Sequence, residues 1–352
     1  MCGDLELAAL LRAVHDEVTG AGPLAAVLRE AEVTDVLVNA PDEVWVDRGS
    51  GLVPLDVQFR DDAAVRSLVT RLLAGSGRRF DNAQPWVDAR LAGGVRLHAV
   101  LPPVARRGTA VSLRIQRSKP FTIDELVACG TTTPVVARVL KAIITARLAT
   151  VVTGGTASGK TTLLSALLGL VDPRDRIVIV EDAAELRPDR PHVVSLEART
   201  PNVDGAGAVT LRDLVRQALR MRPDRLVVGE TRGVEVVDLL AALNTGHDGG
   251  LTTLHANSPR DVPARVEALA APAGMQRAAV HAQLVAGVQA VVHLRRSAGG
   301  DRIVSEIGVL MGEHGIARVL PAMVGSDQGP GAAQLRRLIA DRDGDQEVVP
   351  CQ

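Results

Sequence analysis

Residues 150–170 read TVVTGGTASGKTTLLSALLGL, and this stretch decides the fold class. A β-branched run, Thr150–Thr153, leads into Gly154–Thr161, which fits the pattern GxxxxGK[ST]. An apolar helical pattern follows from Thr162 to Leu170. A strand, a glycine-rich loop and a helix in this order present backbone N–H groups and a positive helix terminus to phosphate oxygens. The sequence therefore predicts a P-loop nucleotide site in an α/β protein.

Each part of this loop has an expected task. The predicted nucleotide-binding residues are Gly154, Gly155, Thr156, Ala157, Ser158, Gly159, Lys160, Thr161 and Thr162. Lys160 is expected to bridge the β and γ oxygens of ATP, and the Thr161 hydroxyl to bind Mg²⁺. Lys160 is also one of only three lysines among 40 cationic side chains, in a chain that otherwise uses arginine. An ordinary glycine-rich turn before a core helix is the alternative interpretation.

Two further apolar runs end in acidic residues. Leu226–Gly229 is followed by Glu230, and Ile177–Val180 is followed by Glu181 and Asp182. Because the carboxyl ends of parallel strands meet at the ligand-binding edge of an open α/β sheet, these carboxylates are expected beside the P-loop. Glu230 is the Walker B candidate, although a glycine precedes it where an aspartate is usual, and Glu181 or Asp182 would orient the attacking water. Acids that merely favour a helix N-terminus are the alternative for the second run. The candidate Mg²⁺ ligands are Thr161, Glu230 and Asp182.

Two histidines flank the short apolar run Gly250–Leu254. His247 and His255 are both expected at the phosphate edge, where an imidazole can sense the γ-phosphate; a buried, merely hydrogen-bonded histidine is the alternative. A zinc site is not expected, because no further ligands stand at suitable spacing.

Three arginines recur every four residues on a helix that is predicted before the Walker B run. This spacing indicates either a solvated helix face or a surface between subunits: Arg212, Arg216 and Arg220.

The rest of the chain divides into two predicted domains, a linker and a tail. Residues 1–117 combine a helical start (1–32), a helix at 61–74 and short strands, which predicts a mixed α/β domain. Pro and Gly at both ends of 118–133 are typical of a flexible linker. Residues 134–325 alternate helical patterns with compact apolar strands, which predicts a mostly parallel sheet with helices on both faces. Residues 326–352 are expected to form a peripheral tail.

Composition limits the function classes. The 40 Lys plus Arg nearly balance 41 Asp plus Glu, and the chain has three Phe, two Trp and no Tyr. A nucleic-acid coat or a base-stacking platform is therefore disfavoured. Three scattered cysteines form no disulfide framework, which fits a reducing cytoplasm. The first residues lack a basic region and no apolar run reaches the ~18 residues of a membrane span, so neither a secretory signal nor a transmembrane helix is expected.

The order of these motifs resembles the secretion ATPase superfamily, the motors of type II and type IV secretion, type IV pili and conjugal transfer. The resemblance rests on the P-loop, the Glu181–Asp182 box, RPDRLVVGE at 222–230 and TGHDGGLTTLHANSP at 245–259. It extends to DVLVNAPD at 35–42 and RLHAVLPP at 96–103. Among these motors the chain looks most similar to the tight-adherence pilus-assembly ATPases, which are often described as conjugal-transfer ATPases.

The resemblance implies a hexameric ring that hydrolyses ATP with Mg²⁺. It also implies an N-terminal domain flexibly joined to a RecA-like P-loop motor, a cytoplasmic location at the inner face of the cell membrane, and docking to an inner-membrane platform protein. A RecA-like translocase of nucleic acid, such as conjugative DNA, is the alternative function. Near-neutral charge and scarce aromatics favour the secretion motor.

The resemblance also implies roles for single residues. Glu230 corresponds to the Walker B acid and Glu181 to the acid-box glutamate, while Lys160 and His255 complete the catalytic candidates in the motor domain. Two arginines near the end of the first domain correspond to residues that reach the nucleotide across the cleft between the domains: Arg114 and Arg117. A glutamine at position 116 separates what is often a contiguous basic pair.

Overall fold

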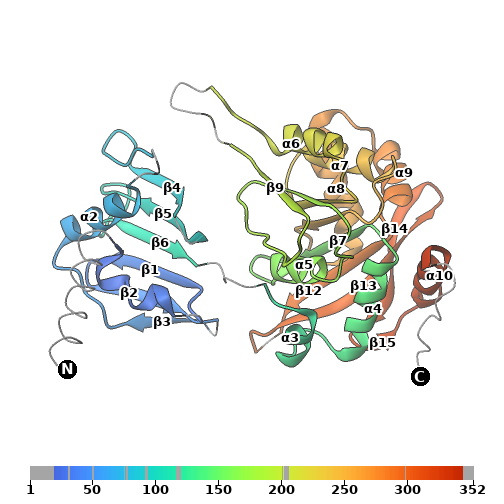
Figure 1. The fold of residues 1–352 in the computed structure, drawn as a ribbon, viewed down its shortest axis with the longest axis horizontal. Helices are drawn as coiled ribbons and strands as arrows, with labels where there is room; N and C mark the ends of the chain where they lie inside the picture. The colour runs from blue at the N-terminus through green and yellow to red at the C-terminus, as the bar shows by residue number, and fades with distance from the viewer. Residues whose placement is uncertain are drawn as a thin grey trace. The chain divides into compact units, whose positions relative to one another are not determined.

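The computed structural model describes residues 20–30, 32–49, 51–74, 76, 78–91, 94–115, 120–199, 201, 206–297 and 299–343. Within these ranges the chain forms two compact units that divide at Ser118 (Figure 1). Most of the predicted helical start (1–32) lies outside the described residues. Its remainder contains two short 3-10 turns, η1 (Gly22–Leu24) and η2 (Val27–Arg29).

The N-terminal unit is a six-stranded antiparallel sheet with the strand order β3-β2-β1-β6-β5-β4. Buried and exposed side chains alternate along most of its strands, because one face packs against the helix α2 (Asp62–Leu72). The helix begins where the Asp61 side chain accepts the Ala64 N–H at 2.9 Å. The strands are β1 (Asp35–Ala40), β2 (Glu43–Asp47), β3 (Leu52–Leu55), β4 (Trp86–Arg90), β5 (Arg96–Val100) and β6 (Ala110–Arg114).

The C-terminal unit is built on a nine-stranded sheet with the order β15-β14-β13-β12-β7-β11-β10-β8-β9. The strands from β12 to β9 in this order run parallel, whereas β13, β14 and β15 are added antiparallel. The bounds are β7 (Thr150–Gly154), β8 (Ile177–Glu181), β9 (Val193–Glu197), β10 (Arg225–Thr231), β11 (Leu251–Leu254), β12 (Ala290–Arg296), β13 (Arg302–Glu313), β14 (Ile316–Val324) and β15 (Asp327–Gln328).

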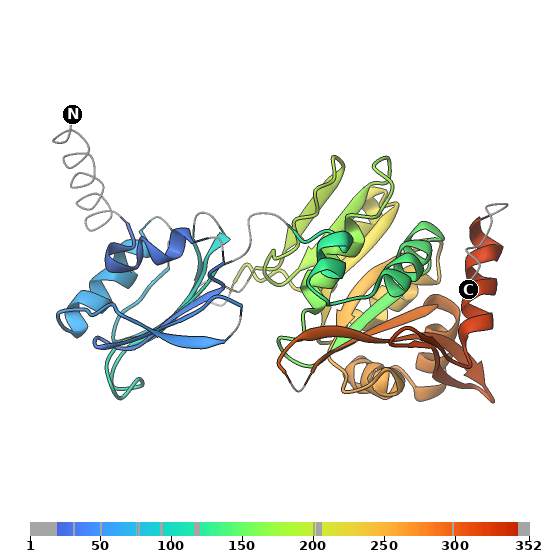
Figure 2. The ribbon, with the colours of Figure 1, turned by 90° about the horizontal axis from the view of Figure 1, so that it is seen from below.

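Helices cover both faces of this sheet (Figure 2). One face carries α3 (Ile123–Ala128), α4 (Pro134–Thr145), α5 (Lys160–Leu168) and α10 (Ala332–Asp343). The other carries α6 (Leu211–Ala218), α7 (Glu235–Leu243), α8 (Val262–Ala270) and α9 (Arg277–Gly287), with the 3-10 turns η4 (Leu219–Met221), η5 (Pro259–Asp261) and η6 (Ala271–Ala273) nearby. Because both faces are covered, β7 and β8 are buried at every position, and they read as apolar runs rather than as alternating patterns. The predicted fold class is confirmed.

Two segments differ from the expected organisation. Within the predicted linker, 118–133, the chain forms α3, which begins with a capping box between Thr122 and Glu125 and buries Leu126. Within the predicted peripheral tail, α10 buries Leu335 and Ile339 in the same core as α4 and α5. Both segments therefore pack as parts of the C-terminal unit. In the described part of the chain, every helix is too short or too polar to cross a bilayer.

Candidate functional site

The GxxxxGKT loop joins the carboxyl end of β7 to the N-terminus of α5. A Cβ atom at Gly154, whose φ is +152°, would lie 2.5 Å from the carbonyl oxygen of Leu294 and 2.5 Å from Ser158 Oγ. Gly159, with φ of +95°, is the N-cap residue of α5. Only glycine fits both the tight packing and the left-handed backbone, so the loop geometry accounts for these two residues. The turn leaves the N-terminus of α5 facing the loop, as phosphate binding requires.

Lys160 is held inside the loop. Its Nζ donates hydrogen bonds to the carbonyl oxygens of Gly154 at 3.1 Å and Gly155 at 2.8 Å, and the residue is 7% exposed. Burial is the main cause that lowers the pKa of Lys160. Gly155, Thr156 and Ala157 are exposed, Ser158 is buried, and Gly159, Thr161 and Thr162 are half-buried. The structure thus presents the Lys160 cation together with a row of loop residues at one sheet edge.

Glu230 and His255 converge on Lys160. Glu230 lies in β10 and His255 follows β11, the strand between β10 and β7. His255 Nδ1 lies 3.4 Å from Lys160 Nζ, and His255 Nε2 lies 2.9 Å from Glu230 Oε1. An ammonium group only donates, so Nδ1 is the acceptor and Nε2 carries the proton. Glu230 Oε1 is buried, and although His255 Nε2 approaches it to 2.9 Å, Oε1 accepts no aligned hydrogen bond among the described residues.

The charges around this cluster set its protonation. Burial would raise the pKa of Glu230, but the hydrogen bond from Arg232 and the neighbouring positive charges outweigh burial and lower it. Burial, with the nearby charge of Lys160, lowers the pKa of His255. At neutral pH the site therefore holds an anionic Glu230 beside a neutral His255.

The Glu181 carboxylate accepts hydrogen bonds from the backbone of the loop that follows β8. Its Oε1 accepts the N–H groups of Glu185 at 3.0 Å and Leu186 at 3.1 Å, and the residue is 4% exposed. A Cβ atom at Gly229 would lie 2.6 Å from Glu181 Cγ, which explains why glycine replaces the usual aspartate before Glu230. Asp182 is exposed and lies 3.9 Å from Arg232 Nη1. Glu181 therefore fixes the chain after β8.

Sequence reasoning missed three residues at this edge. Arg232 Nη2 donates to Glu230 Oε2 at 2.5 Å, and its position two residues after the Walker B acid was an available signal. The buried His293 of β12 shares a 2.8 Å hydrogen bond with Thr153 Oγ1, at the end of β7. Arg302 of β13 donates through Nε to the carbonyl oxygen of Ala157 at 3.2 Å. The sequence holds no signal for the last two, because β12 and β13 meet the P-loop only in the folded sheet.

Other sequence candidates lie elsewhere. His247 precedes β11, at the opposite edge from the P-loop, so its predicted place at the phosphate edge is wrong. Arg212 and Arg216 each lie 2.7 Å from the carboxylate of Asp238 in α7, so they pair within the unit.

Two arginines, Arg114 and Arg117, are predicted to reach the nucleotide from the N-terminal unit. Arg114 ends β6, is exposed, and lies 3.3 Å from Asp35 Oδ1 of β1, its partner in the ladder. Arg117 lies outside the described residues. The predicted contact of Arg114 or Arg117 with a nucleotide therefore stays a prediction.

A cleft of about 400 Å³ opens beside the loop. It is lined by Gly154, Gly155, His255, Ala256, Asn257, Asp261, Ala264, Arg265 and Ala268. Among the described residues, no three His, Cys, Asp or Glu side chains form a metal cage. Mg²⁺ typically needs only one or two carboxylates together with substrate phosphates, and the exposed Asp182 carboxylate and the Thr161 hydroxyl are hard oxygens of the kind it prefers. The residues present therefore fit Mg²⁺ bound with a nucleotide.

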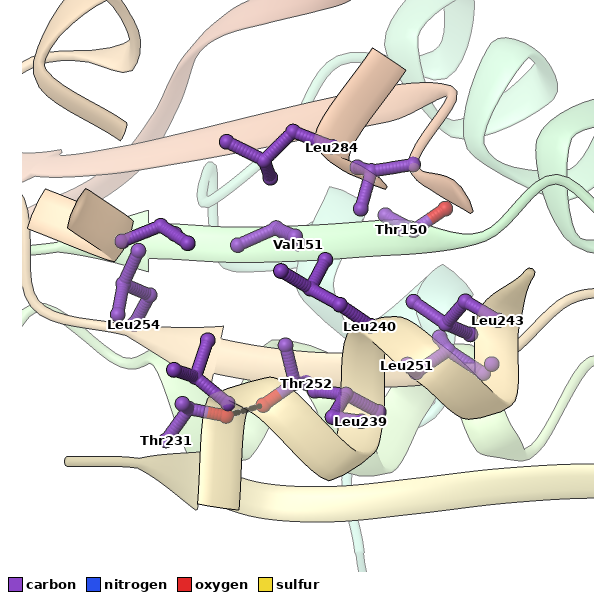
Figure 3. Close-up of a pocket in the computed structure, with 14 residues that line it drawn as sticks. Thr150, Val151, Thr231, Leu239, Leu240, Leu243, Leu251, Thr252, Leu254 and Leu284 are labelled. Atoms are coloured by element: carbon purple, nitrogen blue, oxygen red, sulfur yellow. Dashed lines mark hydrogen bonds between the residues drawn. The ribbon is translucent and has the colours of Figure 1, made fainter. Parts of the chain in front are cut away.

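A second cavity carries no ligand site. It lies among apolar side chains of α7, α9 and the central strands, and the side-chain hydrogen bond drawn there joins Thr231 Oγ1 to Thr252 Oγ1 at 2.8 Å (Figure 3). Its volume is about 20 Å³, enough for one water molecule. The cleft beside the P-loop is therefore the candidate site.

Comparison with known proteins identifies the family and the fold. Residues 17–314 match the family described as type II/IV secretion system protein. A putative conjugal transfer protein of Mycobacterium tuberculosis is 54% identical over 350 residues, which cover 97% of this chain and 99% of that protein. The conjugal transfer protein TrbB of Rhizobium radiobacter is 31% identical over 299 residues, 84% of this chain and 88% of that protein. The crystal structure of the pilus retraction motor PilT with bound ADP has the same fold, with a TM-score of 0.61, 22% identity and 82% coverage of each chain. The motif-based resemblance is confirmed, and the chain belongs to the type II/IV secretion system protein family.

Proposed function

We propose that this protein hydrolyses ATP at the P-loop cleft and works as the motor of a conjugal-transfer or pilus-type secretion system. The observation that carries the proposal is the convergence of Lys160, His255 and Glu230 behind a GxxxxGKT loop. Family membership and the names of the relatives support the transport role. ATP is the substrate and Mg²⁺ the accompanying ion.

In this proposal the loop residues bind the phosphates, and a carboxylate accepts the proton of the attacking water. The N–H groups of the loop and Lys160 hold the phosphates, and Lys160 offsets the charge that develops on them. Thr161 and Asp182 are the groups that would hold Mg²⁺, which neutralises phosphate charge when bound. Glu230, also a metal candidate from the sequence, is assigned here to the water. Arg232 fixes Oε2, and Oε1, which lies 2.9 Å from His255 Nε2, is the oxygen that accepts the proton.

His255 and Glu181 have supporting roles in this proposal. The neutral imidazole of His255 lies between Lys160 and Glu230, where it can sense the γ-phosphate without adding a full charge. Glu181 positions the loop after β8 through the N–H groups of Glu185 and Leu186. This division makes Glu230 the base and Glu181 a positioning residue.

The assembly is part of the same proposal. The proposal includes a hexameric ring, a cytoplasmic location and docking to an inner-membrane platform protein, which the family relationship alone supports. In such a ring an arginine of the N-terminal unit, Arg114 or Arg117, would close over the γ-phosphate as arginine fingers do.

Turnover of ATP by the full-length chain tests the activity. Lys160→Ala is expected to lower the rate by on the order of 10³-fold, because the loss of a cation at the β and γ oxygens removes several kcal/mol of transition-state stabilisation. Lys141→Ala, which removes an exposed lysine of α4, is the matched control and should keep the full rate. A folded Lys160→Ala protein with the wild-type rate would contradict the assignment. Turnover that DNA stimulates, and that salt suppresses, would instead favour the translocase.

A further inference from the structure

Two arginines face each other beside the P-loop. Arg296 ends β12, Arg302 begins β13, and the two are direct partners in the antiparallel ladder. Direct partners carry their side chains on the same face, roughly 4.5–5.5 Å apart at Cβ, where like charges destabilise a sheet. Among the described residues, no carboxylate lies within ion-pair distance of either guanidinium. In that part of the chain, this pair of like charges therefore has no acidic partner.

Both side chains lie on the face of the sheet that carries the P-loop helix. Leu294 and Val304, two residues from Arg296 and Arg302 along their strands, belong to the core formed with α5. Side chains two apart on a strand share a face. The contacts of Arg302 confirm that its side chain points toward the P-loop. Its Nε donates a hydrogen bond to the carbonyl oxygen of Ala157, and its Cδ would lie 3.2 Å from a Cβ atom at Gly159.

The order of the strands indicates which end of a bound nucleotide would lie nearest to these two arginines. The order β12-β7-β11-β10 places the P-loop strand between the arginines and the acid. Glu230 and His255 lie on the β11–β10 side of β7, and the γ-phosphate must face them for hydrolysis. The opposite side, next to β12 and β13, therefore receives the α-phosphate and the nucleoside.

We propose that Arg296 and Arg302 bind the α-phosphate end of the adenine nucleotide. This inference rests on the proposed function, since it needs a nucleotide in the P-loop. Guanidinium N–H groups bind phosphate oxygens in charge-assisted pairs, and an anion between the two arginines removes their mutual repulsion. The pair thus contributes affinity for ADP and ATP alike and takes no part in cleavage of the γ-phosphate.

Binding and turnover of the full-length chain test this inference. Arg296→Gln and Arg302→Gln are each expected to weaken both ADP and ATP about tenfold, the loss of one charge-assisted pair. At saturating ATP, kcat should stay within about twofold of wild type. Affinity for inorganic pyrophosphate, which needs only the loop and Lys160, should be unchanged. Arg295→Gln is the matched control: Arg295 is equally exposed, but its ladder partner is Ile303 and its side chain lies on the other face.

The alternative results are distinguishable. If the wild-type chain binds neither ADP nor ATP, the proposed function fails. If it binds both and the two variants bind as tightly as Arg295→Gln, the inference is wrong. Equal weakening of ADP and pyrophosphate would show that the arginines only shape the loop, and a loss of kcat with unchanged affinity would place them at the γ-phosphate. Either result overturns the proposal. Arg296 makes no contact with Ala157 among the described residues, so Arg296→Gln keeps the test valid if Arg302→Gln fails to fold.

Discussion

Gly229 and Glu181 show how the absence of one side chain sets the role of another. With a side chain at 229, Glu181 Cγ would be 2.6 Å from a Cβ atom, and the carboxylate would leave the N–H groups of Glu185 and Leu186. With glycine there, Glu181 stays buried and holds its loop, and Glu230 is the carboxylate with one oxygen that accepts no hydrogen bond among the described residues. The choice between two acids, which their positions in the sequence leave open, thus depends on hydrogen-bond partners.

The buried side chain of His293 predicts that the free energy of unfolding depends on pH. Burial is the main cause that lowers the pKa of His293, whose ring lies beside Thr153. The unfolded chain then binds more protons than the folded chain below about pH 6.5, so stability falls as the pH decreases through that value. Chemical unfolding between pH 7.5 and 5.5 should show this loss, and His293→Gln should reduce its slope. An unchanged slope in the variant would show that His293 does not contribute.

Elements with a strong local pattern could be predicted from the sequence, and elements with a weak one could not. The apolar runs of β7, β8 and β10, and the loop before α5, carry their own signals, so the sheet core and the P-loop edge were predicted. The short helix α3 was not, because the Pro and Gly residues around it are also typical of a linker. The antiparallel strands that bring Arg302 to the P-loop depend on pairing across the sheet, which no local pattern reveals.

The packing of α3 leads to a prediction at the scale of the element. Leu126 is 2% exposed in the core that α4 and α5 share. Leu126→Ala should lower the free energy of unfolding of the C-terminal unit by about 2–5 kcal/mol, because the lost side chain leaves a cavity. Calorimetry of the full chain measures this, with Val104→Ala, at an exposed valine, as the control. A change below about 1 kcal/mol would mean that the segment behaves as a linker.

At the scale of the whole molecule, each unit has its own hydrophobic core. One core holds α2 and the strands of the N-terminal sheet, and two others cover the faces of the C-terminal sheet. Neither unit therefore needs the other to bury these apolar side chains, as is typical of separate domains. The proposed closure of an N-terminal arginine over the nucleotide needs this independence.

The proposed ring makes a prediction about concentration. If an arginine must close over ATP in an assembled ring, turnover per subunit should rise steeply with protein concentration and reach a plateau once rings form. A dilution series with sedimentation at the same concentrations measures both quantities. Constant turnover per subunit in a population shown to be monomeric would refute the ring mechanism.

The most direct test of the central claim, that Glu230 drives ATP hydrolysis at this P-loop, is single-turnover hydrolysis by the full chain. Glu230→Gln keeps the size of the side chain but cannot accept the proton, so we predict ATP binding within a few-fold of wild type and a hydrolysis rate lower by about 10²-fold or more. Glu181→Gln should slow the step less, and Glu313→Gln, at an exposed acid in the β13 strand, should not change it. A Glu230→Gln protein that binds and hydrolyses ATP at the wild-type rate would contradict the account.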